Sequence, residues 1–466
     1  MSVSGRVVVV GAGFAGLAAA AALTARGHDV TLLERDSRVG GEAEHVFAGG
    51  ARVDLGPTIL TDPAPVMRLF ELLGAPTDAA ALRRLDPGLV VTFPGSRAVA
   101  FHADPAQTAT ALATLGPRAG EDWRRALALG ERAARLAEHF YARGDVAGVR
   151  DLWRFLVGGG VSPGDVITFA RHGSLAKLLD TSMRTAELGR LLAHFARFIG
   201  LGADRAPAVA VVIPYLLATS GVWYPRGGLS ALAETVRDLA VKRGLSLEVG
   251  QTVTRLEHAR GRVSAVLTAG GQRFPVDACV AAADAAEIGR WAPEMAMDRR
   301  SRPGRPALAA RVAWWVLDGA TEAAHHALHF DEAEADPLYA SMPTVSDPDL
   351  APPGRAVLYA LAHGAPGRPA GPTFVQATRQ RLEAARYWPG GRVVAQGASG
   401  GSSSCYGTAI GPGLFASFRP SQRVPGLCNI FRAGGSVFPG PGVANVVRSG
   451  LRAALLTDDI LTGKSA

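Results

Sequence analysis

Three glycines between an apolar run and a helix-forming segment constrain this chain more than any other feature. The run Val7–Val10 is β-branched, which favours a strand buried on both faces. Gly11-Ala-Gly13-Phe-Ala-Gly16 follows at once, and the alanine-rich stretch from Leu17 to Arg26 predicts a helix. Asp29–Glu34 then predicts a second strand that ends in an acidic residue. This order of strand, glycine turn, helix and strand is typical of a Rossmann-like α/β fold.

Each glycine of the turn has its own physical role. Gly11 permits the tight turn, Gly13 lets the backbone approach a pyrophosphate, and Gly16 lets the helix pack closely on the strand. The helix N-terminus presents free N–H groups to the phosphates. Glu34 can accept hydrogen bonds from a ribose and would repel a 2′-phosphate. Residues 1–27 could also pass for a secretory signal, but the ordered pattern favours a dinucleotide site.

The glycine turn does not distinguish NAD from FAD, and the next residues are more specific. Gly40-Gly41 follows the acid, and Val53-Asp-Leu-Gly-Pro-Thr58 comes next; either motif alone could be an ordinary turn. With these motifs the sequence resembles the flavin amine oxidase superfamily and, within it, the phytoene desaturase-like carotenoid desaturases. The resemblance implies bound FAD, with the double glycine crossing the cofactor and Gly56-Pro57-Thr58 near its isoalloxazine ring.

The C-terminal region carries the most specific part of the resemblance. Ala433-Gly-Gly-Ser-Val-Phe-Pro-Gly-Pro-Gly442 looks like the closing signature of the family and most resembles the methoxyneurosporene (hydroxyneurosporene) dehydrogenase branch, which makes the 3,4 double bond. The resemblance implies that Gly434 and Gly435 pass along the FAD and that Gly442-Val443-Ala444 opens a helix facing the flavin. A helix N-terminus there would stabilise the negative charge that the reaction generates.

The motifs carry over a set of candidate site residues. Thr58, Phe438 and Asn445 are the candidate catalytic residues, although a packing or turn role is equally open for each. The candidate cofactor-binding residues are Gly11, Gly13, Phe14, Ala15, Gly16, Glu34, Arg35, Gly40, Gly41, Glu42, Gly56, Pro57, Thr58, Val253, Gly434, Gly435, Gly442, Val443 and Ala444.

Three positions depart from the family pattern. Glu42 stands where Lys or Arg is usual, and its charge would oppose a diphosphate unless the side chain points away. Phe438 replaces a histidine, offering an aromatic face to a polyene or a cation where a histidine could relay a proton. Ala444-Asn445 stands where proline and a small residue or Met are common. These departures bear on the substrate position more than on the FAD site.

The resemblance spans essentially the whole chain and implies an interleaved α/β architecture. A Rossmann-like FAD-binding domain of the amine-oxidase type is expected from residues 1–70, 230–290 and 405–466. An α+β substrate-binding domain is expected from residues 71–229, mainly helical, and 291–404, mainly sheet. Leu245–Val253 is expected to be the strand that brings Val253 to the adenine.

Composition and charge limit the kinds of molecule that this protein is expected to bind. Hydrophobic residues make up 48% of the chain, enough for a sizeable core, and the net charge of +8 comes from scattered arginines, which argues against nucleic acid. The three cysteines and the histidines show no metal-ligand spacing, so we expect no metal and a reduced, cytoplasmic protein.

Two stretches suggest contact with lipid. Residues 206–225 carry no charge and are long enough to span a bilayer, but Pro207 and Pro214 favour a buried channel wall. Residues 150–157 suit either an interfacial anchor or an ordinary core-facing helix. We expect a hydrophobic polyene or isoprenoid substrate and peripheral contact with the inner face of the cell membrane, and leave the oligomeric state open.

The expected activity is FAD-dependent carotenoid desaturation by hydride transfer to flavin, with 3,4-desaturation of a hydroxy- or methoxy-carotenoid favoured. Conjugation stabilises the developing carbocation, so no strong side-chain base is required. An FAD-dependent isomerase or saturase of another isoprenoid is the main alternative. An amine oxidase is disfavoured by the few tyrosines, and a non-enzymatic flavoprotein is the remaining class.

Overall fold

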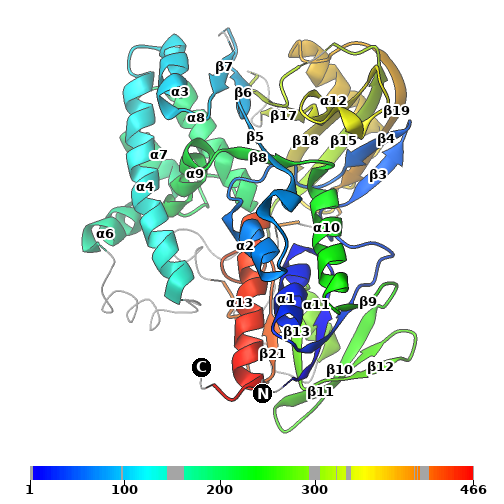
Figure 1. Cartoon of the computed structure of the whole chain (residues 1–466). Helices are drawn as coiled ribbons and strands as arrows, with labels where there is room; N and C mark the ends of the chain where they lie inside the picture. The colour runs from blue at the N-terminus through cyan, green and yellow to red at the C-terminus, as the bar shows by residue number, and fades with distance from the viewer. Residues whose placement is uncertain are drawn as a thin grey trace.

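A five-stranded parallel sheet forms the base of the molecule (Figure 1). The structure is a computed structural model that describes residues 4–95, 98–143, 162–292, 305–321, 323–331, 337–402, 405–406, 408–409 and 419–464. In spatial order the strands are β21 (Ile430–Arg432), β13 (Ala278–Ala281), β1 (Arg6–Val10), β2 (Asp29–Leu33) and β9 (Ser246–Glu248). Sequence-distant segments therefore complete one sheet, and the α/β Rossmann-like fold is confirmed.

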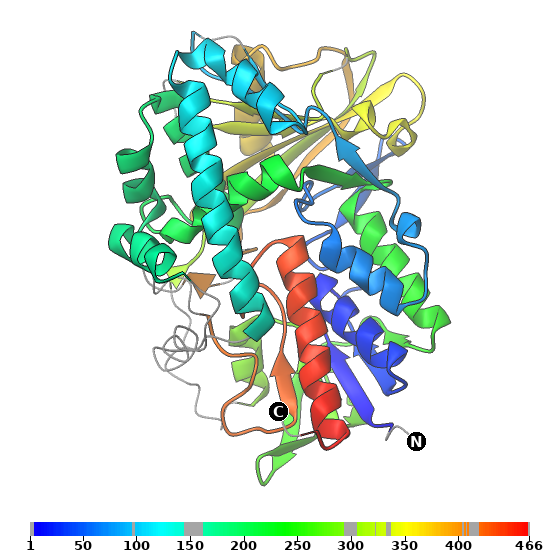
Figure 2. The same ribbon diagram turned by 60° about the vertical axis from the view of Figure 1, so that its left-hand side comes forward.

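Helices lie on this sheet and against one another. They are α1 (Phe14–Ala25), α2 (Ala64–Leu72), α10 (Gly228–Lys242), α11 (Ala285–Trp291) and α13 (Val443–Leu461). Helix α13 runs beside α1, as Figure 2 shows. A Cβ at Gly16 would lie 1.8 Å from the Gly11 carbonyl oxygen, and one at Gly450 would lie 2.1 Å from that of Ala15. Both positions must be glycine for α1 to approach its neighbours.

Two small antiparallel units lie outside this sheet. They are the hairpin β3 (His45–Ala48) with β4 (Ala51–Asp54), and the meander β10 (Val253–Ala259), β11 (Arg262–Thr268) and β12 (Arg273–Pro275). The expected strand over 245–253 is wrong, because β9 ends at Glu248 and Val253 begins β10. Gly250 lies between them with φ 71°, a left-handed conformation that interrupts extended chain.

A seven-stranded sheet lies above the base in Figure 1. Its order is β19 (Arg392–Gly400), β15 (Ala309–Asp318), β18 (Arg355–Gly364), β17 (Leu338–Ser341), β16 (His326–His329), β6 (Leu89–Thr92) and β7 (Val99–Phe101). Only β16 and β6 pair in parallel. Helix α12 (Pro372–Ala384) covers one face, with Leu382 buried beside Trp315. Short pairs join β5 (Leu82–Leu85) to β8 (Val222–Pro225) and β14 (Arg305–Pro306) to β20 (Thr408–Ala409).

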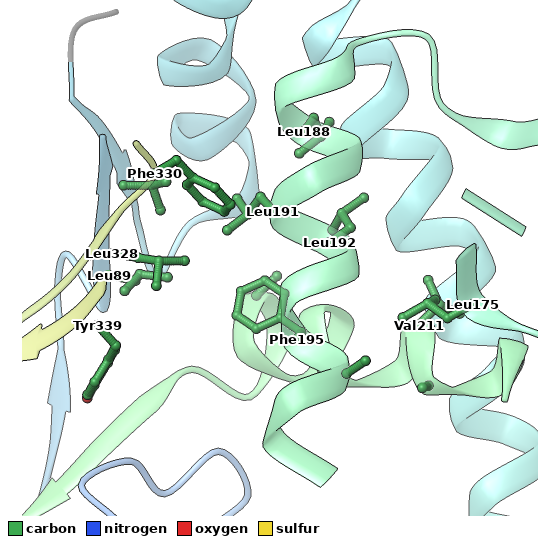
Figure 3. Packing of buried hydrophobic residues seen from close by; sticks show 14 of the residues in the cluster. Leu89, Leu175, Leu188, Leu191, Leu192, Phe195, Val211, Leu328, Phe330 and Tyr339 are labelled. Atoms are coloured by element: carbon green, nitrogen blue, oxygen red, sulfur yellow. The ribbon is translucent and has the colours of Figure 1, made fainter. Parts of the chain in front are cut away.

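A layer of helices packs against the rest of the molecule on the side away from α12. It contains α3 (Pro105–Leu112), α4 (Ala119–Arg143), α6 (Pro163–His172), α7 (Leu175–Ser182), α8 (Ala186–His194) and α9 (Val212–Thr219), with 3₁₀ turns η3 (Phe195–Ile199) and η4 (Ala208–Val211). Figure 3 shows Leu191 and Phe195 beside Phe330 and Leu328 of the sheet side. One continuous apolar core therefore joins these helices to the seven-stranded sheet.

The structure describes only one of the two stretches for which the sequence suggests contact with lipid. Residues 206–225 form η4, α9 and β8 in succession. Among the residues that the structure describes, none of the helices combines the length and apolar character needed to cross a bilayer. Residues 150–157 lie outside the described residues. The domain boundaries given above stay a prediction.

Candidate active site

One cavity of about 1030 Å³ connects the glycine turn of the base to the helical layer. Its walls come from both ends of the chain, from the seven-stranded sheet and from α4, α6, α8 and α9. All three candidate catalytic residues line it, and so do all the candidate cofactor-binding residues except Gly16. Gly16 instead packs against the Gly11 carbonyl, in the close-packing position that the glycine pattern gives it.

The first part of the cavity is a backbone cradle. Gly40 pairs with Gly13 as an isolated bridge, and a Cβ added to Gly41 would lie 3.0 Å from the Gly13 Cα. Side chains at these positions would fill the space in front of the α1 N-terminus. Glu34 is buried beside the cradle, where its Oε2 accepts from the Ala12 N–H at 2.6 Å and its Oε1 from the Asp36 N–H at 3.0 Å. Each carboxylate oxygen keeps a lone pair for a ribose hydroxyl.

The C-terminal segment closes the cradle from the other side. The Gly434 N–H donates to the Ser449 hydroxyl at 3.1 Å, which fixes the segment on α13. Arg419 lines the cavity and donates from Nη1 to the Gly435 carbonyl at 2.8 Å. Burial lowers the pKa of Arg419 to about 10, so the guanidinium keeps its charge at neutral pH. Arg419 stands within the conspicuous Phe-Arg-Pro run of the closing region, a signal that could have identified it.

Glu42 faces the cavity in an environment that opposes its charge. Burial raises the pKa of Glu42, and the nearby carboxylates of Asp284 and Glu44 raise it further. Glu42 is thus part of the cavity lining and is not turned away from the site. Glu42 therefore places a destabilised negative charge at a position where Lys or Arg is usual.

Thr58 belongs to a closed hydrogen-bond chain. Its Oγ1 lies 2.7 Å from the Tyr339 hydroxyl, which lies 2.7 Å from His326 Nδ1. The His326 Nε2 is buried and has no partner. Burial lowers the pKa of His326 well below its ordinary value, so the ring cannot store a proton at neutral pH. These hydrogen bonds thus fix the direction of the Thr58 hydroxyl and do not carry protons away from it.

Phe438 and Asn445 meet at Tyr141, a residue of α4. The Tyr141 hydroxyl donates to Asn445 Oδ1 at 3.2 Å, and the ring centroids of Tyr141 and Phe438 are 5.8 Å apart. The Arg448 guanidinium lies 4.7 Å from the Tyr141 ring centroid and forms an ion pair with Asp62. Motif reasoning missed Tyr141, because nothing in an amphipathic helix marks which residue reaches the C-terminal loop.

The far walls of the cavity are apolar. The lining residues of the helical layer are Ala133, Leu136, Ala137, Phe140, Tyr141, Val166, Phe169, His194, Phe198, Ile199, Leu201, Pro207, Val209, Ala210, Val212, Ile213 and Leu216. No Asp, Glu, Lys or Arg occurs among these described lining residues. The predicted wall within 206–225 is therefore confirmed only for the residues of that stretch that line the cavity, which are Pro207, Val209, Ala210, Val212, Ile213 and Leu216. Within the described ranges, no group of three His, Cys, Asp or Glu residues could hold a metal.

Known proteins agree with this geometry. The family of flavin-containing amine oxidoreductases matches residues 14–456. The chain belongs to that family. It is 32% identical to a phytoene dehydrogenase of Streptomyces griseus, over 96% of this chain and 94% of the relative. It is 28% identical to a hydroxyneurosporene desaturase of Rubrivivax gelatinosus, over 96% and 92%.

The fold has solved counterparts. The cyclohexylamine oxidase of Brevibacterium oxydans superimposes with a TM-score of 0.64 at 17% identity, covering 99% of each chain. The phytoene desaturase-like membership is thus confirmed, and the protein is an FAD-dependent oxidoreductase. The cradle fits FAD, because its glycines leave room for a pyrophosphate and buried Glu34 stands at the ribose position.

Proposed function

We propose that this protein is an FAD-dependent carotenoid desaturase, with 3,4-desaturation of a hydroxy- or methoxy-carotenoid as its reaction. The observation that carries the proposal is the continuity of the FAD cradle with an uncharged apolar cavity. A hydrocarbon chain gains free energy there by leaving water. A protonated amine would be buried beside the helical walls without a counter-ion, which is costly. Relatives that align with this chain over almost its whole length include carotenoid desaturases.

In this proposal the side chains of the protein position the substrate next to the cofactor. FAD, when bound, supplies the acceptor for two electrons and one hydrogen of the substrate. Thr58, held by Tyr339, presents a hydroxyl of fixed direction. Phe438 and Tyr141 offer aromatic faces to a polyene that develops positive charge. The second hydrogen leaves as a proton to solvent, because burial lowers the pKa of His326 and makes its ring a poor proton acceptor.

Anaerobic incubation of the FAD-loaded protein with hydroxyneurosporene tests the proposal. We expect the flavin absorbance to bleach while the polyene absorbance moves to longer wavelength. A polyene that isomerises or becomes saturated with no net flavin bleaching would favour the isomerase or saturase alternative. Unchanged flavin and unchanged polyene would overturn the desaturase.

A matched pair of variants ties the activity to the cavity. Ile213→Trp places an indole in the cavity from α9, and we expect at least a tenfold loss of kcat/KM. Thr219→Trp adds the same side chain at an exposed position of α9 and should leave turnover near the wild-type value. Equal turnover by both variants would show that the substrate binds elsewhere.

We also propose that the polyene is taken up from a lipid surface on the inner face of the cell membrane. Helix α6 supports this, because Val166 and Phe169 line the cavity while Ile167 between them is 64% exposed. We expect the protein to float with anionic vesicles, and Ile167→Asp to reduce flotation without changing FAD content. Equal flotation of the two proteins would contradict a contact through α6.

A further inference from the structure

Two histidines interrupt the apolar part of the cavity. His194 ends α8, and His363 lies on the same face of β18 as the cavity-lining residues Tyr359 and Leu361. Their ring centroids are 6.3 Å apart, and both rings line the cavity. His363 Nε2 lies 2.8 Å from the Tyr406 hydroxyl, so a short polar edge of three side chains faces otherwise apolar walls.

The His194 ring is in an unusual position for a histidine. Its side chain is buried, with 6% of the residue exposed, and the rings of Phe195, Phe198 and Phe330 surround it at centroid distances of 6.3–6.4 Å. Its Nδ1 has no hydrogen-bond partner. A phenylalanine or leucine would pack in the same place without leaving a buried polar atom unpaired. The Nδ1 atom is enclosed by protein, whereas the residue lines the cavity, so a histidine at this place in an apolar wall points to a polar partner that the ligand brings to the Nε2 edge of the ring.

Both rings are neutral, and this defines the ligand chemistry. Burial lowers the pKa of His363 to about 3 and that of His194 well below its ordinary value, with the charge of Arg197 acting in the same direction. A neutral imidazole offers one donor and one acceptor. Such a pair suits a neutral oxygen, whereas a carboxylate or an ammonium group would need a charged partner.

We propose that His194 and His363 bind a neutral oxygen, a hydroxyl or an ether, carried by the otherwise apolar substrate. This inference deepens the proposed function and rests on it for the polyene part of the ligand. The histidines would thereby select an oxygenated polyene over the plain hydrocarbon. They are specificity residues, and the redox step itself does not involve them.

Ligand binding to the FAD-loaded protein tests this, measured as the change in flavin absorbance on titration. The probes are hydroxyneurosporene, its methoxy derivative and neurosporene. We expect the wild-type protein to bind the oxygenated polyenes about ten- to a hundredfold more tightly, as a buried polar group left unpaired by the hydrocarbon predicts. Preference for the hydroxyl alone would assign the acceptor role to the histidines, and preference for both would assign the donor role.

Variants locate the preference. His194→Phe and His363→Phe should bring the ratio of the dissociation constants of neurosporene and the oxygenated polyenes near one and leave neurosporene binding unchanged. His194→Gln should restore part of that ratio. His329→Phe is the matched control, because His329 is another buried histidine with unpaired ring nitrogens but does not line the cavity. It should keep the wild-type ratio.

Two outcomes separate this inference from the proposed function. Desaturation of both polyenes with equal affinity in the wild-type protein, or an unchanged ratio in soluble His194→Phe and His194→Gln, would overturn the inference and leave the desaturase standing. A histidine-dependent affinity ratio without any turnover would support the oxygen site and overturn the reaction.

Discussion

Asp54 is expected to make the stability of the protein fall as the pH rises from about 4 to about 6. Its Oδ2 accepts from the Leu229 N–H at 2.8 Å and its Oδ1 from the Ser230 hydroxyl at 2.5 Å, at the start of α10. Burial raises the pKa of Asp54 to about 6, outweighing these hydrogen bonds and the nearby charge of Arg52. The carboxyl group therefore prefers its protonated form in the folded chain.

The sign and size of the effect follow from linkage. The unfolded chain ionises near the ordinary aspartate pKa of 3.8, whereas the folded chain keeps its proton until about pH 6. The stabilisation is therefore complete below pH 4 and is lost by about pH 6. Each unit of pKa difference corresponds to about 1.4 kcal/mol, so the loss is at most about 3 kcal/mol. Asp54 as a whole residue is only half-buried, so solvent screening reduces the loss to about 1–2 kcal/mol.

Urea unfolding of the wild type and Asp54→Asn at half-unit steps from pH 4 to pH 7 measures this. Asn keeps an oxygen for the Leu229 N–H and removes the titration, so the variant should gain about 1–2 kcal/mol relative to wild type as the pH rises. Subtracting the two profiles cancels every other titrating group. Glu234→Gln, which removes the ion pair with Arg52 at 3.0 Å, is the control and should show no such trend. A flat difference between wild type and Asp54→Asn would refute the argument.

Three further outcomes follow from the cradle and the buried histidines. Gly41→Ala should weaken FAD binding at least about tenfold, because the new Cβ would clash with Gly13 and the backbone at Gly41 has φ 58°. Gly27→Ala is the control: its backbone, at φ 88°, is strained by a side chain in the same way, but the new Cβ would meet open space, so this variant should keep FAD. Glu42→Gln should lower the FAD dissociation constant, measured by flavin fluorescence, since it removes a negative charge from the cavity lining. Glu71→Gln, at the surface away from the cavity, should not; equal effects would contradict that electrostatic argument. Acid should destabilise the protein below pH 6.5, because unfolding lets five buried neutral histidines take up protons; an absence of proton uptake on unfolding, measured from the pH dependence of urea unfolding, would contradict this. These histidines are His194, His325, His326, His329 and His363.

The base of the fold was predictable because backbone geometry fixes its residue types. Gly16 and Gly41 must be glycine for steric reasons, and such positions remain visible in any single sequence. Helices α1 and α13 likewise begin near the residues that the motifs predicted. The strand expected to end at Val253 failed, because apolar alternation continues across the Gly250 turn and marks no break.

The substrate half of the site could not be predicted, because its walls require only apolar side chains of suitable size. Tyr141, His194 and His363 come from two helices and a strand, and no spacing in the sequence relates them. Their place in the cavity depends on how the helical layer packs against the sheet, which many sequences satisfy.

This difference between the two halves explains where specificity can change in such a protein. FAD carries the redox chemistry, so the cradle must keep its glycines whatever the substrate. The apolar walls bind any polyene through area alone, and a methylene more or less alters affinity only modestly. A neutral polar group in those walls has a larger effect, because a ligand without the matching oxygen leaves it buried and unpaired. Exchange of His194 or His363 for an apolar residue should therefore convert an oxygen-selective cavity into a hydrocarbon-tolerant one without altering the FAD site.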